Sequence, residues 1–484
     1  MFSPNSWELN RYNFQNYTIT VIFSLIVGIV FIRFSIIYAF FFLLITIYFF
    51  MGIISSLNFE FVFLANCLGF IFIRFSDFGA KNLSKQIILF LILMMSYFLC
   101  RNNFDEKFSI WSDNLAKVIF IYFSWILIQL IFSMYTISFY QISRVIVQTL
   151  ILLGMFYLTS SYIKTTKHLY WILAILLICA LLESILGILQ HCSPNFYVTP
   201  ADGSRDPHRL MPREYFGYIF PFISRYVREA RGTFGHFNTL GNMLSLFAPL
   251  TFALSLIRET TIIRKMFFWL INLIIFFGLY FSYSRGSLSG VLIGLILIIL
   301  LLTKKRRNKE IKIATVLLLI PLSLFVVYSL TGFFNVYYEN TQNLTIRLSF
   351  WNETFQHIIE SPATFLFGNH YFRILSRQVY QSVVDWTPLG HNSYLAIWER
   401  GGIIELILVV ILFVFSIKNF YFSFKKTQNI YIKHISIGLI ASLIAFSISQ
   451  LFDHKLAFFY DIQIYFFIIL GISIGLKRMV KLLR

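Results

Sequence analysis

Residues 171–189 read WILAILLICALLESILGIL, an almost uninterrupted apolar run. Similar runs are SIIYAFFFLLITIYFFMGII at 35–54 and SLSGVLIGLILIILLL at 287–302. About 17–25 predominantly apolar residues are enough for a helix to cross a bilayer. Hydrocarbon offers no water to bare peptide groups, so a single crossing segment satisfies its own backbone only as a helix. These stretches therefore predict a helical membrane protein.

The whole chain shares this character. Its 484 residues are 58% hydrophobic and only 13% charged, whereas a soluble domain has about 25% charged residues. We expect an all-α polytopic membrane protein with about 12–14 transmembrane helices. The expected spans are 17–32, 35–56, 59–75, 86–100, 114–135, 143–163, 168–190, 238–257, 265–283, 287–303, 312–332, 392–417, 433–451 and 458–476.

Basic residues set the expected orientation, because lysine and arginine concentrate in cytoplasmic loops. KKRRNK at 304–309 and KRMVKLLR at 477–484 fall on the same side when the spans alternate, and both termini join them. The net charge of +19 is then largely membrane-surface charge and not a nucleic-acid footprint. Two long loops, 191–237 and 333–391, are expected on the opposite, periplasmic side with short amphipathic helices.

Both long loops contain arginine but no lysine. The arginines are Arg205, Arg209, Arg213, Arg225, Arg228, Arg231, Arg347, Arg373 and Arg377. A guanidinium forms two parallel hydrogen bonds with a phosphate or carboxylate, which an ammonium cannot do. Pairing with nearby acids such as Asp202 and Glu214, or with lipid phosphates, also accounts for any single arginine. It does not explain the exclusion of lysine, so the set as a whole predicts anion binding.

The first loop ends in a compact motif, RGTFGHFN at 231–238. Arg225, Arg228 and Arg231 are three residues apart and would form one ridge if this segment is helical. The glycines permit sharp turns. Asn238 is expected to cap the next helix, whose N-terminal amides favour an anion, and His236 lies just ahead of it.

Arg285 interrupts two apolar runs within YSRGSLSG at 283–290. A charge near the bilayer centre costs about 2.5–3.5 kcal/mol on insertion scales and less near the interface. Two interpretations remain open. Arg285 either snorkels to the interface at a tight hairpin or faces an anionic ligand in a water-filled external cavity.

The second loop contains TIRLSFWNETFQHI at 345–358, in which Arg347 and Trp351 share one helical face. Phe355 and Ile358 extend the apolar stripe. The pattern predicts an amphipathic helix on the outer surface, and a plain surface helix is the alternative.

GHNSYLAIWERGG at 390–402 begins a long apolar helix behind His391 and Asn392, with Glu399 and Arg400 about two turns deeper. A buried pair is expected there, with Glu399 orienting another arginine, and its role is as readily structural as catalytic. RGTFGHFN, SRGSLSG, RLSFW with FGNHYF, and GHNSYLAIWERGG occur in this order. The ordered set resembles the O-antigen ligase and O-antigen polymerase superfamily over about residues 140–420. One departure is HFN at 236–238, where the family often has HPN, and it affects only the local turn.

The resemblance implies a bacterial inner-membrane enzyme with a periplasmic active site. Such enzymes transfer a glycan from undecaprenyl diphosphate to a sugar hydroxyl without a metal or other cofactor. Their essential residues look like Arg231, Arg285 and His391 here. The expected partners are an undecaprenyl-diphosphate-linked glycan, a glycan or lipid A–core acceptor, membrane lipids and a chain-length regulator, but no nucleic acid. The length of the chain favours a polymerase over a ligase.

In this reading His391 accepts the proton of the acceptor hydroxyl, and the arginines stabilise the diphosphate leaving group. The expected substrate-binding residues are Arg225, Arg228, Arg347, His236, Asn238, Asn392 and Glu399. The expected organisation is N-terminal helices at 1–140, a catalytic region with both loops at 141–420, and C-terminal helices at 421–484.

The alternative from another functional class is a lipid-linked sugar flippase or polysaccharide exporter. A transporter should place charges in the middle of several helices and often shows repeat symmetry. The arginines cluster instead in external loops and at helix ends, and we detect no repeat in the sequence. The pattern therefore favours the enzyme.

Overall fold

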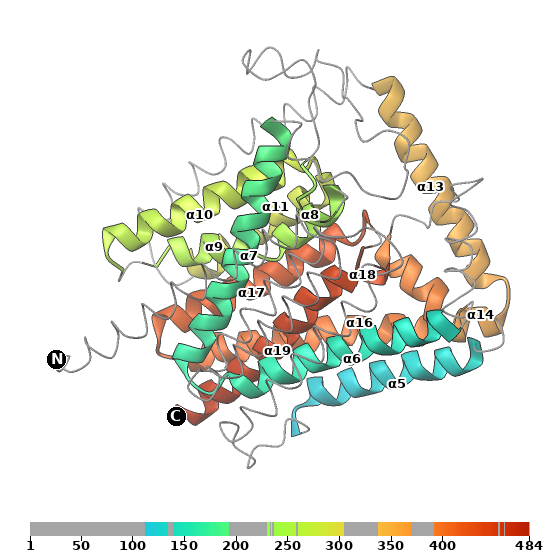
Figure 1. The fold of residues 1–484 in the computed structure, drawn as a ribbon, viewed down its shortest axis with the longest axis horizontal. Helices are drawn as coiled ribbons and strands as arrows, with labels where there is room; N and C mark the ends of the chain where they lie inside the picture. The colour runs from blue at the N-terminus through green and yellow to red at the C-terminus, as the bar shows by residue number, and fades with distance from the viewer. Residues whose placement is uncertain are drawn as a thin grey trace, which may run out of the picture. The chain divides into compact units, whose positions relative to one another are not determined.

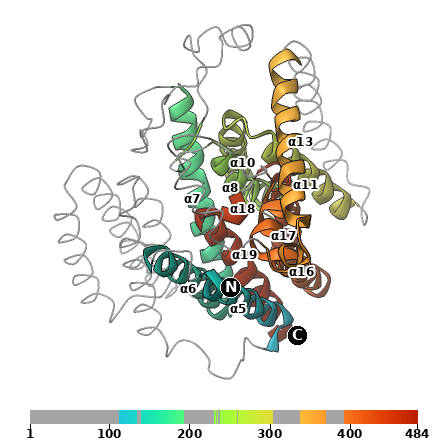
Figure 2. The same ribbon diagram turned by 90° about the vertical axis from the view of Figure 1, so that its right-hand side faces the viewer.

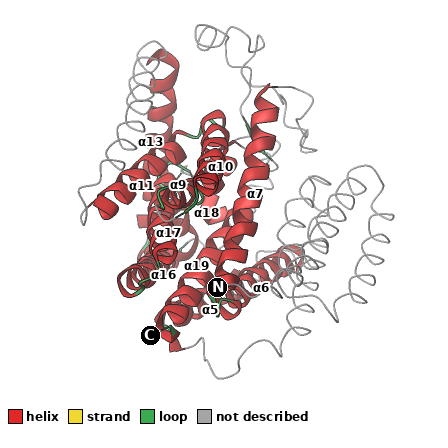
Figure 3. Ribbon diagram, turned by 90° about the vertical axis from the view of Figure 1, so that its left-hand side faces the viewer, coloured by secondary structure: helices red, strands yellow, loops and turns green. Residues whose placement is uncertain are grey.

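The computed structural model describes residues 112–133, 139–192, 230–232, 234, 237–257, 260–303, 337–368, 392–453, 455–458 and 460–483. These residues are almost entirely α-helical and contain no strand (Figure 3). Within this part of the chain, nine helices are long and apolar enough to cross a membrane. The protein is an all-α polytopic membrane protein.

The chain divides into two compact units, one of residues 1–105, 170–179 and 198–205, the other of residues 106–169, 180–197 and 206–484. Of the first unit the structure describes only the part that lies in the middle of α7 (Thr166–Cys192). All contacts described below lie within the second unit.

The candidate spans follow the apolar runs of the sequence (Figure 1). Besides α7 they are α5 (Asn114–Ser133), α6 (Phe139–Tyr162), the pair α8 (Phe237–Ser245) and α9 (Ala248–Ser255), α10 (Ile262–Phe281), α11 (Arg285–Thr303), α16 (Ser393–Lys426), α17 (Ile430–Ser449) and α19 (Tyr460–Leu482). The predicted spans before residue 101 and the span 312–332 lie outside the described residues. Each of the other predicted spans overlaps one of these candidate spans.

Three shorter or less apolar helices complete the described part: α13 (Tyr337–Ile359), α14 (Pro362–Phe367) and α18 (Lys455–Phe458). Among the candidate spans, α17 packs along α9, α11 and α16, and α19 packs along α6 and α16 (Figure 2). Most side chains of α17 and α19 are buried, whereas α10 exposes apolar side chains such as Ile263, Phe267 and Leu270. This contrast is the one expected between central helices and a helix that faces lipid.

Polar contacts join several helix ends at one end of the unit. Lys477 Nζ lies 2.6 Å from Asp113 Oδ2, next to the start of α5. Arg478 Nη2 donates to the carbonyl oxygens of Ser161 at 3.0 Å and Ile163 at 2.9 Å. These bonds occupy carbonyls at the C-terminal end of α6, which lack partners within the helix. We call this end, where α6, α16 and α19 terminate, the basic end. The opposite end, where α8, α11 and α16 begin, is called the site end.

The predicted span 238–257 is two helices, not one. At the division, the N–H of Leu246 donates to the carbonyl oxygen of Met243 at 3.1 Å, and the N–H of Phe247 donates to that of Leu244 at 3.0 Å. Pro249 then starts α9, and proline cannot donate a hydrogen bond to the preceding turn. The residues from Asn238 to Ser255 are all buried, and membrane proteins tolerate a helix break where protein surrounds it.

A second break divides α16, whose 34 residues would extend about 50 Å and so exceed a hydrocarbon core of about 30 Å. Gly402 has φ 74° and ψ 180°, a conformation that side chains rarely permit. The backbone of α14 at Leu366 and Phe367 passes so close that a Cβ atom on Gly402 would collide with it. The segment Ser393–Gly401 is therefore a separate block that precedes the main part of α16.

Candidate functional site

The turn that carries Arg231 is bound to the end of α7. Gln190 Oε1 accepts hydrogen bonds from the N–H groups of Arg231 at 2.9 Å and Gly232 at 2.8 Å, and its Nε2 donates to Gly232 O at 2.8 Å. Glu183, two turns earlier on α7, is buried, and its carboxylate lies beside Gly232. Gly232 has φ 59°, and a Cβ atom there would collide with this carboxylate. The backbone position of Arg231 is thus set by the polar side chains of α7.

The same turn is joined to the elbow between α10 and α11. The N–H of Ala230 donates to the carbonyl oxygen of Phe281, the last residue of α10, at 2.9 Å. Tyr283, in the middle of the elbow, has φ 53°, a left-handed conformation that is uncommon for a residue other than glycine. Arg285 follows as the first residue of α11 and is exposed. Two motifs from separate parts of the chain, those of Arg231 and Arg285, therefore meet.

A buried polar network lies next to the elbow. Asn242 of α8 donates from Nδ2 to Asp453 Oδ2 at 3.0 Å, and its Oδ1 accepts from Gln450 Nε2 at 3.0 Å and Ser287 Oγ at 3.4 Å. Ser393 Oγ donates to Gln450 Oε1 at 2.8 Å, and the Ser393 N–H donates to the carbonyl oxygens of Gln450 and Asp453, both at 2.8 Å. All five residues are buried. The network joins α8 and the starts of α11 and α16 to the end of α17.

The start of α16 is capped within this network. Asn392 Oδ1 accepts hydrogen bonds from the N–H groups of Tyr394 at 2.9 Å and Leu395 at 3.2 Å, the usual role of an asparagine at this position. His391, the residue before it, lies outside the described residues. The start of α16, which follows His391, and Ser287, which follows Arg285, thus share one buried polar network, and the turn that carries Arg231 is joined to the elbow beside it.

Several other predicted site residues lie outside the described residues or are placed differently from the prediction. Arg225, Arg228 and His236 lie outside the described residues, as does the side chain of Arg347. Asn238 was predicted to cap α8, and this prediction is wrong: the helix begins one residue earlier, at Phe237, so Asn238 is buried within its first turn. Arg231 lies in a turn, so a helical ridge with Arg225 and Arg228 does not extend to it.

The helix α13 confirms the amphipathic segment expected at 345–358. Ile358 is fully buried, whereas Phe355 is 40% exposed and packs edge-to-face on Trp398, with 6.2 Å between the ring centres. His357 Nδ1 lies 3.5 Å from Oε1 of the buried Glu399, which joins α13 to the start of α16.

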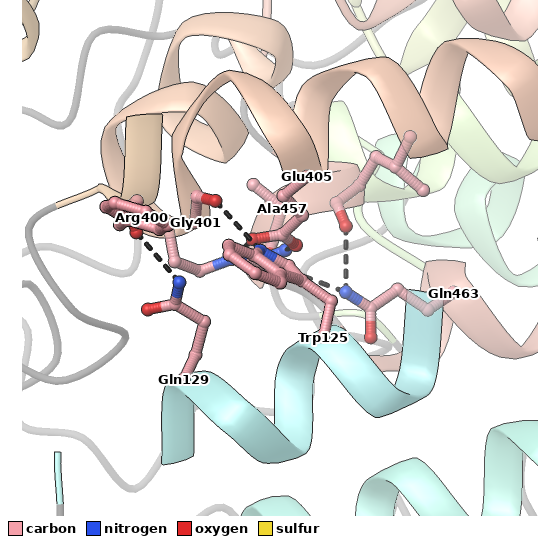
Figure 4. Close-up of polar contacts among 9 residues, drawn as sticks. Trp125, Gln129, Arg400, Gly401, Glu405, Ala457 and Gln463 are labelled. Carbon is pink, nitrogen blue, oxygen red and sulfur yellow. Dashed lines mark hydrogen bonds and ion pairs between the residues drawn. The ribbon is translucent and has the colours of Figure 1, made fainter. Parts of the chain in front are cut away.

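A buried ion pair is present near Glu399, as expected, and it is formed by Arg400 and Glu405. Arg400 pairs with Glu405, one turn further along α16, with Nε 3.3 Å from Oε2 (Figure 4). Glu405 was not expected to be part of this pair, because it lies within an apolar run. Glu399 instead contacts His357.

Four further buried polar residues were not among the predicted site residues: Glu183, Asn242, Gln450 and Asp453. Glu183, Asn242 and Gln450 carried a signal, since each is a polar residue inside a predicted span. Buried polar side chains within a membrane are costly and often mark functional sites. Asp453 lies just beyond its span and had no comparable signal.

The O-antigen ligase family model matches residues 270–410. This range contains the elbow and Arg285, the helices α11, α13 and α14, and the start of α16 with Asn392 and Glu399. A comparison with curated proteins finds no match. The match at residues 270–410 supports the resemblance of this chain to the O-antigen ligase and polymerase superfamily.

Proposed function

We propose that this protein transfers a glycan from undecaprenyl diphosphate to a sugar hydroxyl during assembly of O-antigen or a related surface polysaccharide. The family match and the apolar helices identify a multi-pass membrane enzyme of the O-antigen ligase type. The observation that supports the more specific proposal is the hydrogen bond from Ala230 N–H to Phe281 O, at 2.9 Å. It joins the backbone next to Arg231 to the elbow that precedes Arg285.

The chemistry fits these residue types. In the transfer, the bond between the anomeric carbon and the diphosphate oxygen breaks, and a bond from that carbon to the acceptor oxygen forms. The acceptor proton passes to a base, for which we propose His391. The diphosphate leaves with its electron pair, and Arg231 and Arg285 stabilise this charge without having to donate a proton.

The remaining roles follow from the polar network. We propose that Asn242, Gln450 and Asp453 hold the start of α16 and thereby position His391. Arg225, Arg228, Arg347, His236, Asn238, Asn392 and Glu399 remain our proposed substrate-binding residues. Because the side-chain oxygen of Asn392 caps the helix, its amide nitrogen is the atom we expect to contact substrate.

Complementation tests the proposal. The chain is expressed in bacteria that make its lipid-linked glycan but lack either their O-antigen polymerase or their ligase, and lipopolysaccharide is resolved on a gel. We expect a restored ladder, the polymerase outcome that the chain length favours. Polymer attached to core would indicate a ligase. Movement of the lipid-linked glycan across the membrane, with no new glycosidic bond in either strain, would contradict the proposal and indicate an exporter.

The proposed orientation places the site end in the periplasm and the basic end and both termini in the cytoplasm. Cys192 is exposed at the site end of α7, and Gln428 is exposed between α16 and α17 at the basic end. With Cys67, Cys100 and Cys179 replaced by serine, Cys192 should react with a membrane-impermeant maleimide in intact spheroplasts. A Gln428→Cys variant that also lacks Cys192 should react only after lysis. The opposite pattern would reverse the orientation and place the arginine motifs in the cytoplasm.

A further inference from the structure

Arg400 is a fully buried charged side chain for which the proposed reaction has no direct use. Only 1% of its surface is exposed. Its guanidinium pairs with both carboxylate oxygens of Glu405, and Nη1 donates to the carbonyl oxygen of Ala457 in α18 (Figure 4). A buried charge is tolerated only when it is paired and hydrogen-bonded, so this arrangement strongly constrains its surroundings.

The contacts of Arg400 span the break in α16. Arg400 lies before Gly402 and Glu405 lies after it, so their ion pair connects the two parts of the helix. The Glu405 carboxylate folds back over Gly401, where a Cβ atom would collide with it. Trp125 of α5 donates from Nε1 to the carbonyl oxygen of Gly401 at 2.9 Å. The contacts made by Arg400, Glu405 and Trp125 therefore fix the geometry of the break.

The segment 393–400 is bound at both ends to the connector between α17 and α19. Ser393 contacts Gln450 and Asp453 near the start of this connector, and Arg400 contacts Ala457 near its end. The connector is itself attached to α19, because Gln463 Nε2 donates to the carbonyl oxygen of Leu456 at 2.8 Å. The segment that follows His391 is thus fixed relative to Asp453 at two points.

We propose that Arg400 is a positioning residue for glycosyl transfer. Its pair with Glu405 fixes the angle at Gly402, and its bond to Ala457 holds the segment 393–400, with Asn392 and His391 at its start, against the connector that carries Asp453. A guanidinium suits this task because its planar fork binds two acceptors at once, which an ammonium cannot do. The catalytic part of this inference rests on the proposed function.

Replacement of the pair by apolar residues separates positioning from stability. A single Arg400→Met variant leaves Glu405 buried and unpaired, so its Tm should fall. The double variant Arg400→Met, Glu405→Leu removes both charges, and such replacements of buried pairs are often neutral or stabilising. We expect the double variant to recover most of the Tm and to bind an undecaprenyl-diphosphate donor as the wild type does. Its single-turnover transfer should still be slower by about 10–100-fold, because small displacements of catalytic groups have effects of this size.

Arg400→Lys provides a second variant in case the double variant does not fold. It keeps a positive charge opposite Glu405 but cannot also reach Ala457 with the same geometry. We expect normal donor binding and slower transfer. Arg478→Met is the matched control, because Arg478 is also buried and donates to carbonyl oxygens, but at the basic end. This control should lower the Tm without slowing transfer per folded molecule.

Wild-type transfer in a folded double variant or in Arg400→Lys would overturn the inference. Hydrogen exchange gives a readout that does not depend on the reaction. Amides of residues 393–400 and 450–457 should exchange faster in both variants, and those at the basic end should not. If the wild-type protein transfers no glycan but these amides still exchange faster in the variants, the proposed function fails. The inference that Arg400 holds the segment 393–400 then remains. Unchanged exchange would show that Arg400 does not hold the segment.

Discussion

Replacing His391 with glutamine should slow glycosyl transfer by about 10²–10⁴-fold, the usual effect of removing a general base. Glutamine forms hydrogen bonds but cannot take up the acceptor proton at neutral pH. Donor binding should remain close to that of the wild type, because the diphosphate is bound by arginines. Donor affinity and single-turnover transfer, measured on the same purified variant, separate the two effects.

His168→Gln is a suitable control, because this histidine lies at the basic end. Its Nδ1 is 2.8 Å from the carbonyl oxygen of Tyr162, a contact that a glutamine amide can replace. It should retain wild-type transfer. If His391 only anchored the start of α16, His391→Gln would stay within a few-fold of the wild type and His391→Ala would lower the folded yield. That result would remove His391 from the catalytic role.

Arg231→Lys and Arg285→Lys should each slow transfer by about 10²-fold or more, the typical effect of losing one group that stabilises developing charge. Lysine keeps the charge but loses the bidentate fork that matches a diphosphate. Expression and membrane insertion should be unchanged, because lysine keeps the positive charge at both positions and the backbone hydrogen bonds of the Arg231 turn do not depend on its side chain. The measurements are folded yield, donor affinity and single-turnover transfer.

Arg264→Lys is the matched control for these substitutions. Arg264 is exposed near the start of α10, at the basic end, and should tolerate lysine. Arg205 and Arg377, which are further from the motifs in sequence, should also tolerate it better than Arg231 and Arg285. Full activity in both the Arg231 and Arg285 variants would contradict the proposed binding of the diphosphate.

The described part of the fold was largely predictable, because the length of an apolar run is itself the condition for crossing a bilayer. The breaks were harder to predict. Pro249 is a local reason for the division between α8 and α9, but the break at Gly402 also depends on α14, whose backbone occupies the space a side chain would need. No local pattern predicts which segment will pack there.

The same distinction applies to the candidate site. Arg231, Arg285 and His391 were recognisable because each lies in a short motif, and the structure brings the described neighbours of these residues together. Their supporting contacts were not predictable. Asn242 with Asp453, and Arg400 with Ala457, are partners that lie far apart in the sequence, and only the packing of α8, α16, α17 and α18 brings them within hydrogen-bonding distance. Residue type suggests that a buried polar group needs a partner, but not which one.

The hydrogen bond between Asn242 and Asp453 also sets an order of biogenesis. The pair α8 and α9 is the least apolar of the described candidate spans, and Asp453 is synthesised 211 residues after Asn242. Until then the Asn242 amide lacks this acceptor, and an unpaired amide in hydrocarbon costs several kcal/mol. The buried hydrogen-bond network around Asn242 is therefore complete only after Asp453 has been synthesised. A nascent chain that stops before α17 contains the arginine motifs but lacks Gln450 and Asp453, two of the hydrogen-bond partners of Asn242.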